Sequence, residues 1–369
     1  MSNLHREERH VHNALGAIPM LSDGWSSAVD MQAIFFRLTL DSATEFLFGE
    51  SCDSQIAAMK KEAGQASDDT FLYGFDRCMW YLAERLRFER LYWIINNQEF
   101  RKCIDIVHSF VDKYVHSALI QAQQQKEKPQ DIENVSSQYI FLKALTSTTK
   151  DPVRLRDESL NVLLAGRDTT ASLLSWSILI LARHPDIFAR LRNDVLEQFG
   201  SYDQQRNMDF ASLKSCQYLQ HFLKETLRLY PIVPFNRRCA ANDTTLPCGG
   251  GKDGTSPIYV RKGRTVMYST YVLHRRKDIW GEDAEIFNPD RWIGRNVTWE
   301  YIPFNRGPRT CIGQQFALMR ASYVLVRLLQ RFDKIEDVNC EKDIRFGVSL
   351  TSCPADSVTV RLHQAETEV

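Results

Sequence analysis

The chain contains, at residues 304–313, the run Phe304-Asn305-Arg306-Gly307-Pro308-Arg309-Thr310-Cys311-Ile312-Gly313. Residues 314–330 follow with apolar side chains at helical spacing and without Gly or Pro, so a helix is predicted to begin just after Cys311. Free amide groups and the macrodipole at a helix N-terminus favour a thiolate, the form of cysteine that binds metal. Cys311 is therefore a candidate metal ligand, although an isolated free cysteine is more often a buried structural residue.

The residues around Cys311 suit a large cofactor. Gly307 and Gly313 lack a Cβ, which lets a flat, bulky group approach the backbone. Arg309 stands two residues before the sulfur, where it can meet an anionic group on such a cofactor.

The spacing Phe304-x-x-Gly307-x-Arg309-x-Cys311-x-Gly313 resembles the haem-ligand signature of the cytochrome P450 superfamily at every fixed position. The resemblance implies a mainly α-helical fold with small β-sheets and a haem b (iron protoporphyrin IX) cofactor. Cys311 would be the axial thiolate ligand of its iron, with Phe304, Arg309 and Gly313 against the haem. It also implies O2 as a substrate and NADPH-cytochrome P450 reductase as the electron donor.

Composition fits a globular enzyme. Of 369 residues, 44% are hydrophobic and 25% are charged, and 46 basic residues balance 46 acidic ones, so nothing favours a nucleic-acid partner. The nine cysteines are scattered without a Cys-x-x-Cys pair, which argues against a disulfide framework or a zinc site. Repeats and linkers are not evident, and residues 1–369 are predicted to form one domain.

A second informative segment, residues 160–182, is apolar enough to suggest a membrane helix. Arg167 and Asp168 lie inside it, however, and each costs about 2.5–3.5 kcal/mol in a bilayer, so a buried protein helix ending before Pro185 is predicted. Its centre combines Gly166 with Thr169 and a neighbouring Thr, which favours either a plain kink with solvated polar groups or a functional opening. The resemblance implies the second: an oxygen-activation motif in which Asp168 and Thr169 deliver protons and Ala165 lies over the haem.

A third segment places Glu225 and Arg228 on one face of a helix predicted over residues 221–230. Such pairs are usually exposed and weak. The resemblance implies instead an internal structural triad that Arg291 completes. It also implies that Arg238, in the extended run after Pro231, contacts a haem propionate, with Arg237 as the competing candidate.

Periodicity predicts the remaining elements. Helices are expected over residues 29–48, 71–86 and 100–122, a solvated loop over 123–133 and a flexible turn at 249–254. One hairpin is expected between 258–260 and 265–268, and another between 344–350 and 357–362. Residues 1–9 are polar and carry both charge signs, which excludes a signal peptide or membrane span there.

A narrower resemblance, to fungal n-alkane and fatty-acid hydroxylases, rests on residues 36–50, 163–171, 246–251, 274–278 and 313–318. It implies insertion of one oxygen atom of O2 into an aliphatic C–H bond, by terminal hydroxylation of a long apolar substrate, at the cytosolic face of the endoplasmic reticulum membrane. Apolar residues near the inferred iron and at one hairpin tip are predicted to line the substrate site, although core packing is the alternative for each: Leu164, Ala165, Val233, Phe235 and Leu350. Arg306 departs from the glycine that relatives tend to have.

The resemblance also implies a front segment that this sequence does not contain. Relatives begin with a membrane anchor, the first sheet strands and a helix whose Trp and Arg contact a haem propionate. Two hypotheses follow: a monooxygenase, or a truncated, catalytically inactive haem-binding or misfolded fragment. We expect the chain as written to lack turnover and, without the anchor, to be cytosolic.

Overall fold

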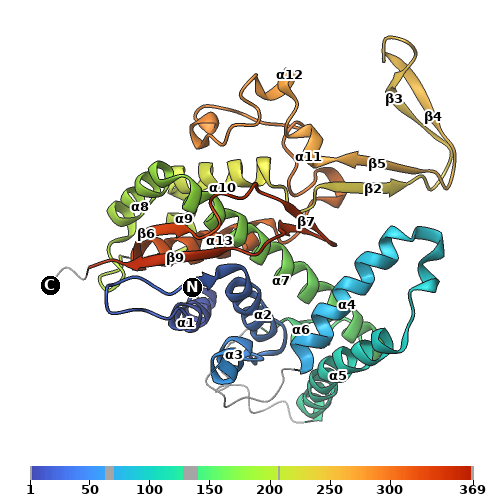
Figure 1. Ribbon diagram of the computed structural model, residues 1–369. Helices are drawn as coiled ribbons and strands as arrows, with labels where there is room; N and C mark the ends of the chain where they lie inside the picture. The colour runs from blue at the N-terminus through green and yellow to red at the C-terminus, as the bar shows by residue number, and fades with distance from the viewer. Residues whose placement is uncertain (1, 63–69, 128–139, 207, 367–369) are drawn as a thin grey trace.

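The computed structural model describes residues 2–62, 70–127, 140–206 and 208–366, which form a mainly helical fold with small antiparallel sheets, as predicted (Figure 1). The α-helices are α1 (Ser2–Gly16), α2 (Met31–Phe48), α3 (Ser54–Glu62), α4 (Thr70–Arg87), α5 (Gln98–Glu127), α6 (Phe141–Leu145), α7 (Pro152–Arg183), α8 (Pro185–Phe199), α9 (Phe210–Ser215), α10 (Gln217–Leu229), α11 (Thr270–Leu273), α12 (Lys277–Trp280) and α13 (Gln314–Arg331). Short 3-10 helices are η1 (Glu89–Ile94), η2 (Pro289–Trp292) and η3 (Gly307–Arg309).

Helix α2 shows how local signals set the ends of the helices. The Asp30 carboxylate accepts the backbone N–H of Gln32 at 3.0 Å and caps the helix start. Gly49 ends it with a φ of +84°, a left-handed conformation that glycine adopts without strain. The end of the helix predicted over residues 29–48 is therefore confirmed.

Helix α7 is the long central helix of the molecule (Figure 1). It ends before Pro185 as predicted, but it begins at Pro152 rather than at residue 160. Asp151 caps it by accepting the N–H of Val153 at 3.0 Å. The early turns were missed because they are exposed and polar, so they carry no continuous apolar run.

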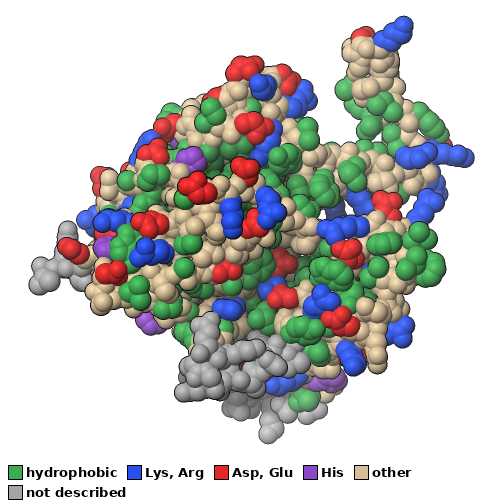
Figure 2. Space-filling view, viewed as in Figure 1, with side chains coloured by type: hydrophobic (Ala, Val, Ile, Leu, Met, Phe, Trp, Pro, Cys, Tyr) green, Lys and Arg blue, Asp and Glu red, His purple; other side chains and the backbone are tan. Residues whose placement is uncertain are grey.

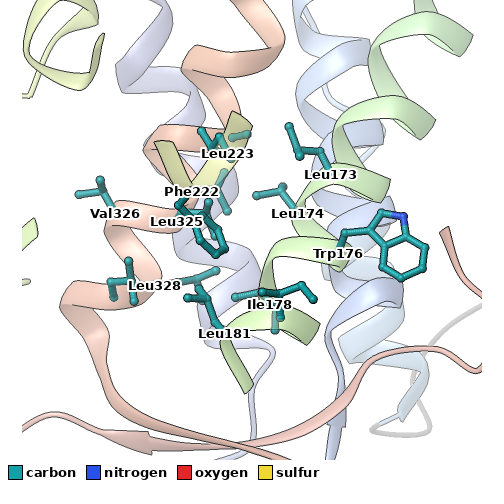
Figure 3. Close-up of a cluster of buried hydrophobic side chains, with 14 of the residues drawn as sticks. Leu173, Leu174, Trp176, Ile178, Leu181, Phe222, Leu223, Leu325, Val326 and Leu328 are labelled. Carbon is teal, nitrogen blue, oxygen red and sulfur yellow. The ribbon is translucent and has the colours of Figure 1, made fainter. Parts of the chain in front are cut away.

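The main hydrophobic core lies where α7, α10 and α13 meet (Figure 3). Leu174 of α7, Phe222 of α10 and Leu325 of α13 are fully buried and point toward one another. Burying a side chain of this size contributes about 1.5–3 kcal/mol. These three helices therefore form the rigid frame from which the loops of the site extend.

A second core joins α2, α4, α5 and the first half of α7. Phe75, Val111 and Leu163 are buried within it. The predicted helices over 71–86 and 100–122 are confirmed as α4 and α5. Residues 123–127 continue α5 instead of forming a loop, and residues 128–133 of that predicted loop lie outside the described residues.

The N-terminal helix α1 was not predicted, because its sequence is polar. Buried polar contacts fix it to its neighbours: Glu7 lies 3.1 Å from Arg320 of α13, and His10 Nε2 lies 2.6 Å from Glu45 of α2. Hydrogen-bonded charges can occupy a buried face when each finds a partner.

Four small sheets complete the described part of the fold. The strands are β1 (Val29–Asp30), β2 (Phe235–Cys239), β3 (Thr244–Gly250), β4 (Ser256–Val260), β5 (Thr265–Ser269), β6 (Phe332–Asp337), β7 (Phe346–Val348), β8 (Ser352–Pro354) and β9 (Thr359–Gln364). They pair in the orders β1-β9-β6, β2-β5, β3-β4 and β7-β8. The β3-β4 hairpin projects from the body as an arm (Figure 1).

Both predicted hairpins were wrong in their partners. Strand β4 pairs with β3 across the glycine-rich turn, and β5 pairs with β2, so the turn near Lys262 connects two sheets. Likewise β7 pairs with β8, while β9 pairs with β6 and β1. Strand periodicity shows which side chains alternate, but it does not show which of two neighbouring turns closes a hairpin, and here the strands pair across the turns at 251–255 and 349–351.

None of the helices described here combines the length and apolarity needed to cross a membrane.

Candidate active site

The Cys311 loop is closed by backbone hydrogen bonds. The N–H of Cys311 donates to the carbonyl of Phe304 at 2.9 Å, and the N–H of Thr310 donates to Gly307 at 3.0 Å. Asn305 and Gly307 turn the chain with φ values of +60° and +74°. Asparagine and glycine are the residues that best tolerate this conformation.

Cys311 and its neighbour stand out from the protein surface. Helix α13 begins three residues later, and the Cys311 side chain is exposed. Ile312, an apolar residue, is 104% exposed. A thiol beside a fully exposed aliphatic side chain, at the start of a helix anchored in the core, is the kind of surface that an apolar metal-containing cofactor covers.

These residues fit haem b. A soft thiolate suits iron, and the exposed cations Arg309 and Arg238 are available for the two propionates. Beside α7 there is room, because a Cβ added at Gly166 would meet no atom within 4 Å. Phe304 and Gly313 lie in the Cys311 loop itself, and the position of a Cβ on Gly313 is 3.9 Å from Cys311 Sγ.

The sheet of β2 and β5 lies next to this loop. Tyr268 of β5 donates its phenolic hydrogen to Asn305 Oδ1 at 2.6 Å. The Arg238 guanidinium lies 5.7 Å from the Tyr268 ring, whereas Arg237 Nη1 is 3.5 Å from Glu89. Of the two candidates for a propionate contact, Arg238 is therefore the one on the side of Tyr268, while Arg237 faces η1.

The central turns of α7 hold the predicted proton-delivery residues. The Thr169 hydroxyl donates to the Ala165 carbonyl at 2.6 Å. Asp168 is buried, and its Oδ1 lies 3.0 Å from Nη1 of Arg167, which is also 2.6 Å from Asp76. The described hydrogen bonds do not join the Asp168 carboxyl to the Thr169 hydroxyl. Helix α7 continues through residues 165–170 without a break.

Burial raises the pKa of Asp168 above its usual value, and the neighbouring Arg167 charge opposes that shift. A carboxyl with a raised pKa exchanges its proton more readily near neutral pH than an exposed one.

Glu225, Arg228 and Arg291 form a buried ionic cluster. Arg228 Nη2 lies 2.8 Å from Glu225 Oε1, and Arg291 Nε lies 3.3 Å from the same oxygen. Glu225 also accepts the indole N–H of Trp292 at 3.0 Å. Sequence reasoning missed Asp283, whose Oδ2 lies 2.8 Å from Arg291 Nη2 and whose pKa is lowered by that bond.

His274 joins this cluster to the Cys311 loop, a role that sequence reasoning also missed. Its Nδ1 lies 3.2 Å from the Arg228 carbonyl, and its Nε2 lies 3.0 Å from the backbone N–H of Ile302. Burial, which outweighs other influences, lowers the pKa of His274 to about 3. A neutral ring with the proton on Nδ1 makes both bonds, donating to Arg228 and accepting from Ile302.

Comparison with known proteins agrees with this geometry. A sequence profile of the family described as Cytochrome P450 matches residues 19–356. The chain belongs to the cytochrome P450 family. Haem b is the cofactor of this family, and the predicted resemblance to the superfamily is confirmed.

Three fungal proteins are among the curated relatives of this chain. Cytochrome P450 monooxygenase g430 of a Fusarium species is 48% identical over 98% of this chain and 64% of its own length. Cytochrome P450 monooxygenase alt2 of Alternaria solani is 44% identical over 93% of this chain and 66% of its own. Cytochrome P450 52A10 of Candida maltosa is 49% identical over 83% of this chain and 60% of its own. The chain thus spans roughly two thirds or less of these relatives.

A crystal structure described as the cytochrome P450DA heme domain has the same fold, with a TM-score of 0.77 at 20% identity. It matches 98% of this chain and 73% of its own.

Arg306, the predicted departure from the family pattern, does not strain this loop. Its φ of −146° is extended backbone that any residue adopts, and its guanidinium donates to the Val297 carbonyl at 3.2 Å. The side chain is exposed beside the cysteine loop.

The predicted substrate residues differ in burial: one packs in a hydrophobic core, and the others are half-buried or exposed. Leu164 packs against the second core, which agrees with the core-packing alternative. Val233 and Leu350 are half-buried, and Phe235 is 47% exposed. A 2.8 Å bond from Ser352 N–H to the Ile232 carbonyl brings the β7-β8 turn beside the segment before β2. Ala165 is exposed on α7.

Proposed function

We propose that this chain carries the haem-thiolate site of a cytochrome P450 monooxygenase that inserts one oxygen atom of O2 into an aliphatic C–H bond. The observation that carries the proposal is the exposed Cys311 thiol, held by the 2.9 Å bond between its own N–H and Phe304 at the start of α13. The haem, when bound, supplies the activation of O2.

The residues of this chain have separate roles in the proposal. Cys311 would hold the haem iron, and Gly313 and Phe304 shape the loop around it. Arg309 and Arg238 would form ion pairs with the haem propionates. Glu225, Arg228 and Arg291 keep the segment leading to the loop in place through their buried ion pairs.

Proton handling is assigned to Thr169 and Asp168. The Thr169 hydroxyl is directed at the Ala165 carbonyl, and rotation about χ1 releases its hydrogen toward the open space beside Gly166. Asp168, with its raised pKa, is the proton source one residue away.

The proposed substrates are n-alkanes or fatty acids, hydroxylated at the terminal carbon. Apolar side chains of Val233, Phe235 and Leu350, all at least partly exposed, support an elongated hydrocarbon. The 49% identity to a Candida maltosa cytochrome P450 supports the fungal group. NADPH-cytochrome P450 reductase is the proposed electron donor, at the endoplasmic reticulum membrane.

The test of ligation is spectroscopic. The chain is titrated with haemin, reduced and exposed to carbon monoxide, beside a Cys311→Ser variant. The strongly red-shifted Soret band of a thiolate-ligated ferrous haem is expected for the natural sequence and not for the variant. A variant that keeps this band would refute the assignment of Cys311.

Substrate class is tested separately. Long-chain fatty acids and n-alkanes should shift the ferric spectrum toward high spin, whereas short-chain controls should not. If every long chain leaves the spectrum unchanged in a haem-loaded preparation, the hydrocarbon proposal is wrong, while the thiolate result stands independently.

A further inference from the structure

A cavity of about 390 Å³ lies where α8 and α13 end. Its walls are the last turns of these two helices, the loop 200–206 and the end of β9 with the residues that follow it. Since α13 has 18 residues, the cavity is about 25 Å along this helix from the Cys311 loop. Its volume is within the range of about 300–1,000 Å³ that is typical of small-molecule sites, yet none of the haem or substrate residues named above lines it.

Three arginines line this cavity, and we call them the arginine cluster: Arg192, Arg206 and Arg331. In the described part of the chain, no carboxylate oxygen lies within 4.0 Å of any of the three. Arg192 and Arg331 are half-buried. Burial lowers the pKa of Arg192, and the charge of Asp333 opposes only part of this shift. Half-buried cations without a carboxylate partner are stabilised when an anion binds beside them.

The backbone holds Arg192 in a fixed orientation. Its Nε donates to the carbonyls of Leu329 and Phe332, both at 3.1 Å, at the end of α13. Neither of its two Nη groups has a hydrogen-bond partner among the residues that the structure describes. Arg192 therefore presents a pair of free N–H donors at the cavity, and the helix-capping bonds use only its Nε.

The other two arginines are also only partly engaged. Arg206 Nη1 donates to the Glu197 carbonyl at 2.6 Å, at the end of α8. Arg331 Nη2 lies 3.5 Å from Gln364 Oε1, which is the outer limit of a hydrogen bond. Each keeps further N–H donors for a ligand, because a guanidinium carries five.

Acidic residues limit the charge that the cavity can accept. Asp203 and Glu366 line it and are exposed, so three cations and two carboxylates leave one positive charge. Around the edge of the molecule where α8 and β9 end, Figure 2 shows Lys and Arg side chains interspersed with Asp and Glu side chains. The helix ends add partial negative charge, which Arg192 and Arg206 meet through their bonds to carbonyls. The cavity thus suits one compact anionic group better than a highly charged chain of them.

We propose that this cavity binds a small phosphate monoester, with its phosphate group on the arginine cluster. Guanidinium groups bind phosphate oxygens through parallel N–H···O bonds, which makes arginine the preferred residue for this group. A phosphate monoester has three free oxygens, one for each arginine, whereas a carboxylate has two. The remaining volume accommodates the organic part of the ester beside Tyr202, whose ring lies 5.1 Å from the Arg331 guanidinium.

The first test measures which phosphates bind. Inorganic phosphate, glucose 6-phosphate, AMP and ATP are titrated into the 369-residue chain by isothermal titration calorimetry at constant ionic strength. At least one of the two monoesters should bind tenfold more tightly than inorganic phosphate, because its organic part adds contacts. AMP should bind more tightly than ATP, since the additional phosphates of ATP meet Asp203 and Glu366. A ligand that binds only the folded chain should also raise its melting temperature as the ligand concentration rises.

Two variants of equal charge test the arginine cluster. Arg206→Gln/Arg331→Gln should weaken binding of the tighter monoester at least tenfold. The matched control Arg101→Gln/Arg154→Gln removes the same charge from exposed positions on α5 and α7 and should leave binding unchanged. Circular dichroism confirms that both variants are folded.

A third variant tests the acidic residues. Asp203→Asn/Glu366→Gln should raise the affinity for ATP at least threefold and change the affinity for the monoester less. An unchanged preference for AMP over ATP would show that these carboxylates do not limit the charge of the ligand, which contradicts the proposed selectivity.

Other outcomes would overturn the proposal itself. Equal monoester binding by the natural sequence and the Arg206/Arg331 variant would do so, as would an equal loss in the Arg101/Arg154 control. Failure of every phosphate to bind a chain with a helical circular dichroism spectrum would have the same meaning. If inorganic phosphate binds as tightly as both esters, the cavity takes free phosphate and the ester assignment is wrong. Since none of these measurements requires haem or turnover, their result is independent of the proposed monooxygenase activity.

Discussion

Tyr268 donates a 2.6 Å hydrogen bond to the side chain of Asn305, the residue that turns the cysteine loop with a φ of +60°. This bond attaches the loop to the β2-β5 sheet, which also carries Arg238. This hydrogen bond therefore holds the Cys311 loop and the β2-β5 sheet together.

Tyr268→Phe should lower the free energy of unfolding by about 0.5–1.5 kcal/mol, because one hydrogen bond is lost and Asn305 Oδ1 loses its donor. Urea unfolding measures this change. In a double-mutant cycle with Asn305→Gly, which keeps the left-handed backbone accessible, the two effects should be non-additive. Tyr259→Phe, on the exposed arm, removes a solvent-exposed hydrogen bond to Asp243 and serves as the control, with a smaller expected loss of stability. Full additivity in the cycle would mean that the Tyr268–Asn305 bond is absent in solution.

Glu225→Gln should be among the most destabilising single substitutions in the described part of the chain. It removes the charge that faces the fully buried Arg228, and breaking such a pair costs about 3–5 kcal/mol. Chemical denaturation should show this loss. Arg276→Gln breaks the exposed pair with Asp278 and should have no measurable effect. Similar midpoints for the two variants would contradict the assigned role of burial.

His274 should make the fold acid-sensitive. Because burial lowers its pKa from 6.5 to about 3, the unfolded chain takes up this proton more readily between those values. Its contribution to stability is complete above the unfolded pKa and is lost as pH falls toward the folded one, by up to about 1.4 kcal/mol per pH unit.

The matched experiment compares urea midpoints of the natural sequence and His274→Asn from pH 7 to pH 4. The variant should be less stable at neutral pH but should lose less stability on acidification. His108, His184 and His221, whose pKa values burial also lowers, remain in both proteins and cancel in the difference. Parallel curves would show that His274 does not titrate across this range.

Thr169→Val should retain haem binding and change proton delivery. The substitution keeps the side-chain shape but removes the hydroxyl that bonds Ala165. In a preparation that turns over, more peroxide should form per reductant consumed, while the carbon monoxide spectrum stays the same. Thr169→Ser keeps a hydroxyl and should remain close to the natural coupling; equal peroxide yields in all three would remove Thr169 from the mechanism.

Local sequence features predicted the helices well. In α2, α10 and α13 the apolar spacing recurs within a few turns, and residues such as Asp30 and Gly49 mark the ends directly. The strand partners were not predictable in this way. The two strands flanking Lys262 look like a hairpin, but each finds its partner earlier in the chain, in β3 or β2.

In the functional site, too, local sequence predicts some features and not others. The positions of Cys311 and Gly313 follow from short spacing in one loop. The links through Tyr268 and His274 join residues that are distant in the sequence, and their roles depend on tertiary packing that no single segment encodes. Asp283 lies near Arg291 in the sequence, but the loop between them carries no periodic pattern that would predict the pair.

The bond between Cys311 N–H and the Phe304 carbonyl makes the intervening loop a closed ring of fixed circumference. An inserted or deleted residue within it would displace the sulfur or break the ring, whereas a change of side chain at exposed Arg306 leaves the ring intact. Variant libraries aimed at this loop should therefore diversify residue identity at constant length. Loop exchange with other proteins should succeed only between rings of equal span.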